Sequence, residues 1–322
     1  MSVKVIDQVV TEKFSAYHSD CVDVVRGLPD SSVDFSVFSP PFASLYTYSA
    51  SDRDMGNVKD HDEFHAHFSF LIRELARVLR PGRLVAVHCM QIPMSKAKDG
   101  AIGVHDFRGE IIRAFRGAGF IYHSEVCIWK DPVMQMQRTK ALGLLHKTIR
   151  TDSSMSRQGM ADYLCVFRKD GKNDRPVSHT HESFPVERWQ RYASPVWATS
   201  AGVDDEGFVK YANPTAANLD KRGIDQGDTL QYTSAREHND EKHICPLQLE
   251  VIRRAVRLWT NPGDVVLSPF MGIGSEGFVS LQEGRRFVGA ELKASYYGQA
   301  VRNLQRAADG EKQASLFGVA AE

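Results

Sequence analysis

Residues 264–277, which read DVVLSPFMGIGSEG, combine a short apolar run, a glycine-rich turn and the start of a helix. Gly272, Gly274 and Gly277 fit the spacing G-x-G-x-x-G, in which glycines permit positive φ angles and let the backbone approach a ligand closely. A second apolar run ends at Glu291, 19 residues after the first glycine, and a carboxylate there can accept hydrogen bonds from ribose hydroxyls. The stretch therefore predicts a site for a nucleoside cofactor at the end of a buried strand, without identifying the cofactor.

Apolar and amphipathic runs alternate along most of the rest of the chain. The patterns predict strands at 33–38, 84–87, 121–129, 163–168, 264–267 and 287–291. They predict helices at 60–79, 108–118 and 247–258, where apolar residues recur at spacings of three and four. Pro81-Gly82 is expected to end the first of these helices, and Gly119 to cap the second. Such alternation is typical of an α/β fold with a doubly wound, mostly parallel sheet.

Composition narrows the class of protein. The 322 residues (36.1 kDa) suffice for one large α/β domain or two modest ones. Forty basic and forty acidic side chains cancel, so a nucleic-acid surface would have to be a local patch. Five cysteines without a C-x-x-C pair indicate no disulfide framework and fit a reducing cytosol. Without a secretory signal or 18 consecutive apolar residues, a cytoplasmic protein is expected.

A second motif, SPPF at 39–42, directly follows the predicted strand 33–38. Two consecutive prolines end the strand and present fixed backbone carbonyls. Carbonyl and hydroxyl acceptors can bind both hydrogens of an amine, and the Phe42 ring can stack on a planar group. By itself, such a motif is more often only a strand-ending turn.

A nicotinamide-dinucleotide dehydrogenase is one interpretation of the glycine turn. It requires a second nucleotide-binding half, but only 31 residues follow Glu291. It also leaves residues 39–42 unexplained.

Together, the two motifs make the chain resemble the β-class DNA amino-methyltransferases, which use S-adenosyl-L-methionine. The family's catalytic motif, [D/N/S]-P-P-[Y/F/W], is matched by Ser39, Pro40, Pro41 and Phe42. Its donor motif, F-x-G-x-G, is matched by Phe270, Gly272 and Gly274. In the β class the catalytic motif precedes the donor motif, as it does here. The resemblance implies the methyltransferase fold in its permuted order, and the chain resembles most the enzymes carried by phages and prophages.

Three further segments resemble the family. Residues 17–21 with Leu28-Pro29 are similar to its opening G-D-C…L-P, 78–82 to its V-L-K-P-G turn, and 243–247 to a segment that lies against the donor. The family usually has Gly where Ser19 stands and Asp where Ser268 stands. The resemblance implies the following donor-binding residues: Asp20, His243, Ile244, Cys245, Pro246, Leu247, Ser268, Phe270, Gly272, Gly274, Ser275 and Glu291.

The resemblance also implies the chemistry. The Ser39 hydroxyl and the Pro40 carbonyl accept the two amine hydrogens and free the nitrogen lone pair, after the base has left the duplex. Ser at the first position is usual for cytosine-N4 enzymes, whereas Asp or Asn is usual for adenine-N6 enzymes, which are the alternative. Cytosine C5 methylation would need Pro-Cys, and the chain has only the reversed Cys245-Pro246. A catalytically inactive DNA-binding relative is the non-enzyme alternative.

Double-stranded DNA is the expected partner, and the sequence leaves the oligomeric state open, a homodimer included. Residues 131–160 carry a net positive charge and predict a DNA-facing insertion, with a solvated basic loop as an equal alternative. The candidate contacts are Arg138, Lys140, Lys147, Arg150 and Arg157. No metal site is expected, because His61, His65 and His67 are interpreted as a solvated helix face.

The chain divides into three predicted parts. Residues 1–168 form the catalytic half and 242–322 the donor-binding half. Between them, 169–241 is rich in Asp, Asn, Gly, Ser, Thr and Pro and predicts a loop-rich insert for target recognition. Its aromatic residues Trp189, Tyr192 and Trp197 are interpreted as a small core within the insert.

Overall fold

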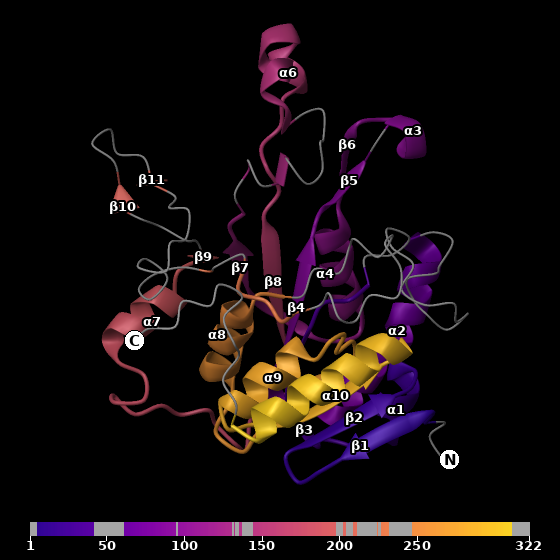
Figure 1. The fold of residues 1–322 in the computed structure, drawn as a ribbon, viewed down its shortest axis with the longest axis vertical. Helices are drawn as coiled ribbons and strands as arrows, with labels where there is room; N and C mark the ends of the chain where they lie inside the picture. Colours follow the sequence, from indigo (N-terminus) through magenta and orange to yellow (C-terminus); the bar gives the residue numbers. More distant parts are fainter. Residues whose placement is uncertain are drawn as a thin grey trace.

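The computed structural model describes residues 5–41, 61–94, 96–130, 132, 135–136, 144–197, 202–203, 209–210, 224, 227–231 and 247–310. Within them, one large sheet has the strand order β1-β2-β13-β12-β3-β4-β8-β7-β9 (Figure 1). In that order, the strands are β1 (Asp7–Val10), β2 (Phe14–His18), β13 (Arg286–Glu291), β12 (Val265–Ser268), β3 (Val33–Phe38), β4 (Leu79–Met90), β8 (Asp162–Arg168), β7 (Ile121–Ile128) and β9 (Val196–Trp197). The five strands from β2 to β4 run parallel, so the predicted α/β class with a mostly parallel sheet is confirmed.

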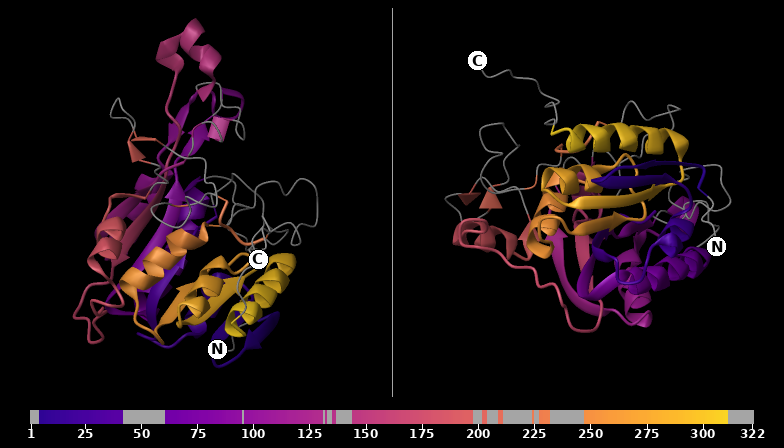
Figure 2. Two further views of the ribbon diagram at one scale, coloured as in Figure 1. Left: turned by 60° about the vertical axis from the view of Figure 1, so that its left-hand side comes forward. Right: turned by 90° about the horizontal axis from the view of Figure 1, so that it is seen from below.

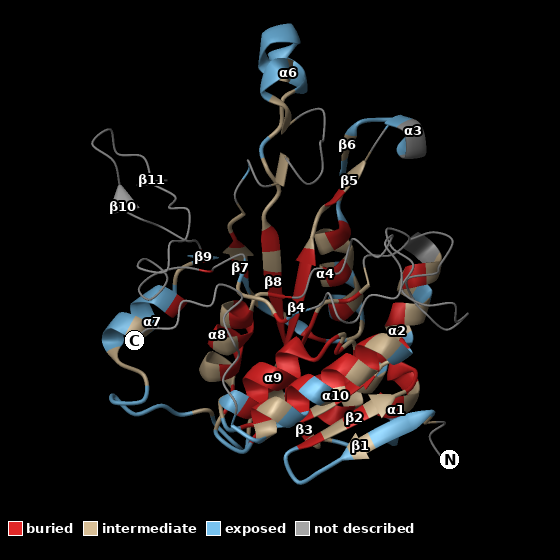
Figure 3. Ribbon diagram, viewed as in Figure 1, coloured by how far each residue is buried: buried red, intermediate tan, exposed pale blue. Residues whose placement is uncertain are grey.

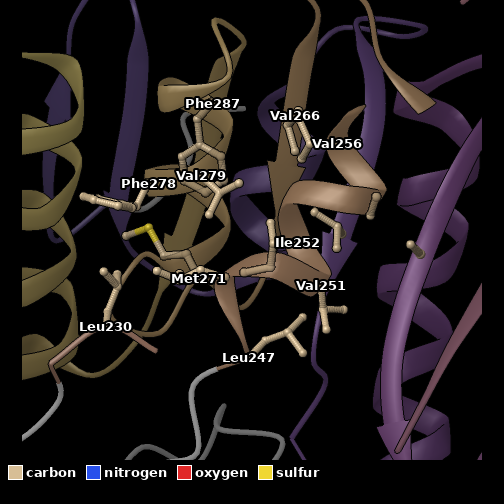
Figure 4. Close-up of a cluster of buried hydrophobic side chains, with 14 of the residues drawn as sticks. Leu230, Leu247, Val251, Ile252, Val256, Val266, Met271, Phe278, Val279 and Phe287 are labelled. Atoms are coloured by element: carbon tan, nitrogen blue, oxygen red, sulfur yellow. The ribbon is translucent and has the colours of Figure 1, made fainter. Parts of the chain in front are cut away.

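Helices cover both faces of this sheet (Figure 2). One face carries α8 (Leu249–Trp259), α9 (Ser275–Gln282) and α10 (Ala294–Ala308), and the other carries α1 (Cys21–Gly27), α2 (His61–Val78) and α4 (Phe107–Gly117). Successive strand residues point to opposite faces, so Val266 of β12 packs in the first core and Leu267 in the second. Figure 4 shows the first core around Val266, Ile252 and Phe278. Burial is concentrated in these two layers (Figure 3).

The predicted helices 60–79, 108–118 and 247–258 correspond closely to α2, α4 and α8, and Gly119 follows α4 with a φ of +90°. α2 ends at Val78, just before Pro81-Gly82, as predicted, but the following strand starts earlier than the predicted residue 84, because β4 begins at Leu79 and contains both residues. Gly82 has a φ of +73° and donates its N–H to the Lys169 carbonyl at 3.0 Å. A Cβ at this position would lie 2.8 Å from Asn173. The glycine at position 82 therefore permits the irregular backbone at the start of β4.

Trp189, Tyr192 and Trp197 do not form a small core of their own within the insert at residues 169–241. The short β9 joins the edge of the main sheet beside β7, and Trp197 in it is buried in the core shared with α8. Tyr192, at the end of α7 (Val186–Tyr192), is also buried, and the guanidinium of Arg254 lies 5.2 Å from both ring centroids. Trp189 is 56% exposed. Hydrophobic burial therefore ties the start of this segment to the catalytic core.

Two arms extend from the sheet beyond the ends of β4 and β7 (Figure 1). The first is the ribbon of β5 (Ile92–Met94) and β6 (Gly103–His105), which is joined by α3 (Lys96–Asp99). The second connects β7 to β8 and carries α6 (His146–Thr151) and the 3-10 turn η4 (Ser153–Met155). A further small ribbon pairs β10 (Gly202–Val203) with β11 (Val209–Lys210). Among the described helices, none has the length and apolar character to cross a membrane.

Candidate functional site

The parallel pairing of β3 with β12 brings the two sequence motifs together. Ser36 donates its hydroxyl hydrogen to the Leu267 carbonyl at 2.9 Å, across 231 residues of sequence. Because parallel strands end at the same edge of a sheet, Ser39 after β3 and Ser268 at the end of β12 lie at one edge. The Phe38 and Phe270 rings pack there with their centroids 5.7 Å apart.

The glycine turn between β12 and α9 has the backbone that its sequence predicts. Gly272 and Gly274 have φ angles of +51° and +87°. A Cβ at Gly274 would lie 3.2 Å from Ala300 of α10, whereas one at Gly272 would meet no atom of the described residues within 4 Å. Gly274 therefore permits close helix packing, and Gly272 leaves the main chain open to a ligand.

Glu291 ends β13 beside this turn, and main-chain donors orient its carboxylate. Gly272 donates its N–H to Oε2 at 3.0 Å, and Lys293 donates its N–H to Oε1 at 2.8 Å. The Ser19 N–H donates to the Glu291 carbonyl at 3.1 Å, which brings the end of β2 to the same place. Next to it, Asp20 caps α1 by accepting the Val22 N–H at 2.9 Å. The sequence pattern did not indicate this capping role.

These residues fit a polar nucleoside ligand. The Ser268 hydroxyl is buried and has no hydrogen-bond partner among the described residues. A buried hydroxyl of this kind favours a ligand that can pair with it. The Ser268 hydroxyl, the oriented Glu291 carboxylate and the open main chain at Gly272 lie at the ends of β12 and β13, which we call the polar edge.

A chain of polar contacts leads inward from Ser39. Ser39 Oγ and His88 Nδ1 lie 2.9 Å apart, and His88 Nε2 and Asp162 Oδ2 lie 3.0 Å apart. Lys130 Nζ approaches the same Asp162 oxygen at 2.6 Å. His88 and Asp162 are 7% and 2% exposed, because β4 and β8 pair antiparallel at this point. We name Ser39, His88, Asp162 and Lys130 the Ser39 chain.

Asp162 stays ionised within this chain. Burial acts to raise the pKa of its carboxyl, but the charge of Lys130 and the hydrogen bond with His88 outweigh burial and lower the pKa below its ordinary value. The sequence patterns did not indicate His88, Asp162 or Lys130 as site residues. The one available signal was a histidine inside the otherwise apolar run 84–89.

Glu276 carries a second buried carboxyl, which no sequence pattern singled out. It lies in the first turn of α9, directly after the glycine turn, and is 5% exposed. Burial raises its pKa from 4.5 to about 8, and the charge of Glu291 acts in the same direction. Its carboxyl therefore keeps its proton at neutral pH beside the polar edge.

Seven predicted site residues lie outside the described residues: Phe42, Arg138, Lys140, His243, Ile244, Cys245 and Pro246. Leu247 is buried in the hydrophobic core with Phe278 (Figure 4), and Ser275 begins α9. Lys147 and Arg150 are exposed on α6, and Arg157 is half-buried beyond it. Their predicted contacts with donor or DNA stay predictions.

His65 of α2 does not simply face solvent, because it shares a carboxylate with His105 of β6. His65 Nε2 lies 2.8 Å from Glu110 Oε2, and His105 Nε2 lies 2.9 Å from Glu110 Oε1. Burial acts to raise the Glu110 pKa, but the two imidazoles outweigh it and lower the pKa. Within the described part of the chain, no group of three or more metal-binding side chains is arranged to hold a metal ion.

Comparison with known proteins places these features in context. A family model described as DNA methylase, of the N6/N4 methyltransferase type, matches residues 33–302. The chain is 41% identical over 295 residues to the Type II methyltransferase M.XycI of Xanthomonas campestris pv. cyanopsidis, covering 90% of this chain and 87% of the relative. It is 34% identical over 298 residues to M.BglII of Bacillus subtilis, covering 89% of this chain and 68% of the relative.

Two solved structures share the fold. The cytosine-N4-specific PvuII DNA methyltransferase matches with a TM-score of 0.61 at 16% identity, covering 96% of this chain and 98% of that one. A DNA modification methylase from Thermus thermophilus, complexed with S-adenosyl-L-methionine, matches with a TM-score of 0.60 at 22% identity, covering 90% and 94%.

The buried Glu276 carboxyl predicts a pH-dependent gain in stability for Glu276→Gln. Between pH 4.5 and about 8 the unfolded chain ionises this group while the folded protein keeps its proton, so wild-type stability falls as the pH rises. Glutamine stays neutral, so the variant should gain up to about 4 kcal/mol over wild type at pH 8 and little at pH 4. Urea unfolding at both pH values measures this. Glu187→Gln, at an exposed position of α7, is the control for removing one charge. An equal gain in stability of Glu276→Gln at both pH values would contradict the prediction.

Proposed function

The chain belongs to the N6/N4 DNA methylase family, and from this premise we propose that it methylates the N4 atom of a cytosine that has been flipped out of duplex DNA. The enzyme is an S-adenosyl-L-methionine-dependent DNA methyltransferase that acts on an exocyclic amine. The observation that carries the choice of cytosine is the serine at position 39, whose hydroxyl lies at the sheet edge beside the glycine turn. Adenine N6 is the alternative target.

The turn at residues 39–41 suits an amine because it offers acceptors. Pro40 and Pro41 have no N–H, so the main chain there contributes carbonyl oxygens and no donors. An exocyclic amine presents two hydrogens, which the Ser39 hydroxyl and the Pro40 carbonyl accept. A base with a carbonyl at the same position, such as thymine, would face acceptor against acceptor. The turn therefore favours a base with an exocyclic amine, such as cytosine or adenine, over thymine, and Phe42 stacks on the ring.

The donor occupies the polar edge formed by the ends of β12, β13 and β2. When bound, S-adenosyl-L-methionine supplies the methyl group as an electrophile. Glu291 accepts hydrogen bonds from the ribose hydroxyls, and the Ser268 hydroxyl pairs with a polar group of the donor. Gly272, which has no side chain, lets the donor lie close to the main chain. Asp20, Phe270, Gly274 and Ser275 line or support the same edge.

The arm between β7 and β8 contacts the DNA. Because β8 runs antiparallel to β4 and Met90 pairs with Asp162, the arm leaves the sheet at the edge where β3 and β4 end. Figure 1 shows α6 far out on this arm. Lys147 and Arg150 on α6 are exposed and suit phosphate contacts, while the segment 169–241 supplies sequence choice.

The product identifies the target base. Plasmid DNA from cells that express the protein is digested to nucleosides and examined by mass spectrometry. We expect N4-methylcytosine, because an all-acceptor turn led by serine binds the cytosine amine. N6-methyladenine would replace the proposal by its alternative. Unmodified DNA, or 5-methylcytosine, would refute amine methylation.

Glu291→Gln tests the donor site. The amide has the same shape but loses the charge, and its NH2 faces a main-chain N–H. Losing a charged acceptor costs about 1.5–3 kcal/mol, so donor affinity should fall roughly 10- to 100-fold by calorimetry. Glu125→Gln on β7, which removes a carboxylate paired with Arg108 instead, should bind the donor as wild type does. Equal donor affinity in both variants would show that Glu291 does not bind the donor.

The double variant Lys147→Gln/Arg150→Gln tests the arm. Each lost phosphate contact releases about one fewer counterion, so the slope of log K against log salt should become shallower by about 2. Affinity for the target duplex should fall while donor binding is retained. Arg113→Gln/Arg116→Gln on exposed positions of α4 serves as the matched control. If both double variants keep the wild-type slope, the arm is a solvated basic loop.

A further inference from the structure

We propose that His88 and Asp162 act as a proton relay behind Ser39. The relay fixes the direction of the Ser39 hydroxyl and takes up the proton that the amine loses. The inference rests on amine methylation, the proposed function, and holds for cytosine or adenine. His88 and Asp162 do not touch the base in this scheme. They are positioning and proton-accepting residues that act through Ser39.

The direction of each hydrogen bond follows from the buried carboxylate. Ionised Asp162 only accepts, so His88 must donate its Nε2–H to Oδ2. Neutral His88 then has a lone pair on Nδ1, to which Ser39 donates its hydroxyl hydrogen. The Ser39 hydrogen therefore points away from the base, and its oxygen lone pairs are free to accept an amine hydrogen.

The same order of bonds gives the proton a path. As the N–CH3 bond forms, the S–CH3 bond breaks, the sulfur takes the bonding electron pair, and the amine nitrogen becomes positively charged. One N–H bond then breaks, its proton moves to Ser39 Oγ, and the original Ser39 hydroxyl proton moves to His88 Nδ1. Ser39 is unchanged and His88 becomes an imidazolium held by Asp162. His88 later loses this proton to solvent, which restores the starting state.

Lys130 balances the chain in its resting state. With His88 neutral, the Lys130 ammonium and the Asp162 carboxylate cancel, which stabilises the buried carboxylate without a charged imidazole. Once His88 carries the proton, Lys130 repels it across the shared carboxylate oxygen. That repulsion favours release of the proton before the next turnover.

A serine, a histidine and an aspartate linked by successive hydrogen bonds also suggest acyl transfer, but the turn at residues 39–41 does not suit that reaction. Acyl-transfer sites stabilise an oxyanion with main-chain N–H groups, often that of the residue after the nucleophile. Here the next two residues are Pro40 and Pro41, which have none. An acceptor-rich turn suits an amine and repels an oxyanion. We therefore assign the Ser39 chain to proton transfer and not to acyl transfer.

The test compares single-turnover methyl transfer for Asp162→Asn and His88→Asn with wild type. In Asp162→Asn the amide can donate to His88 Nε2, which reverses the tautomer and turns an Nδ1–H toward Ser39. We expect the transfer rate to fall at least about 100-fold while donor and DNA affinity are retained. In His88→Asn the amide oxygen can still accept from Ser39 but cannot take its proton, so the rate should fall although the hydroxyl stays oriented.

The pH profile separates a relay from a structural role. Among described residues, the titratable groups that face His88 are Asp162 from β8 and, through it, Lys130 after β7. Protonation of His88 blocks the relay, so the wild-type rate should decline toward acid pH with a one-proton limb. His88→Asn should lose that limb. Glu110→Gln, which alters the other carboxylate that contacts imidazoles, should keep both the rate and the limb.

The outcomes are distinct from those that test the proposed function. If wild type modifies no amine, amine methylation fails. If wild type methylates DNA and His88→Asn keeps the wild-type rate and acid limb, the relay is wrong. Thermal unfolding and donor binding identify a variant that fails to fold, in which case the other variant decides.

Discussion

The parallel pairing of β3 with β12 is the constraint on which the site depends. It joins segments 231 residues apart and is held by buried polar groups. Asp34, 1% exposed, accepts the Val265 N–H at 2.9 Å and is ion-paired with Arg80, while Arg83 binds the Asp34 carbonyl and the Asp264 carboxylate. These charges are paired at the amino ends of the strands, where they fix register. The opposite ends carry the buried Ser268 hydroxyl and the open glycine turn, which suit a ligand.

Local patterns predicted the parts of the fold that local interactions determine. The apolar stripe of α2 and the glycine turn before α9 both formed as their spacing indicates, because each is decided within a few residues. Most strand pairing is decided by contacts distant in sequence, so β9 was taken as part of a separate insert although Trp197 completes the main core. The β1–β2 hairpin is local but was also missed, because β1 is mostly exposed and has no clear apolar pattern. The irregular start of β4 depends on Lys169, 87 residues beyond Gly82.

The site divides in the same way. Residues 39–41 and the glycine turn are contiguous motifs, so the chemistry proposed for them could be inferred from the sequence. The Ser39 chain is not contiguous, since its two inner hydrogen bonds span 49 and 74 residues. Within an apolar strand, His88 resembles any satisfied core histidine until β8 brings Asp162 beside it. A carboxylate at the start of a strand and a lysine after another carry no shared spacing that sequence alone could reveal.

In the proposed reaction, the Ser39 chain also supplies what a serine needs at this position. A carboxylate at the head of the motif only accepts hydrogen bonds, so it meets an amine correctly in any orientation. A hydroxyl can donate or accept, and a hydrogen turned toward the amine would oppose it. Serine therefore needs a fixed acceptor on its inner side, and His88 Nδ1 at 2.9 Å is such an acceptor. Neutral imidazole alone could present either tautomer, so Asp162 is required to select one, and Lys130 to keep Asp162 ionised. The identity of one motif residue is thus coupled to three side chains on strands that the motif does not contain.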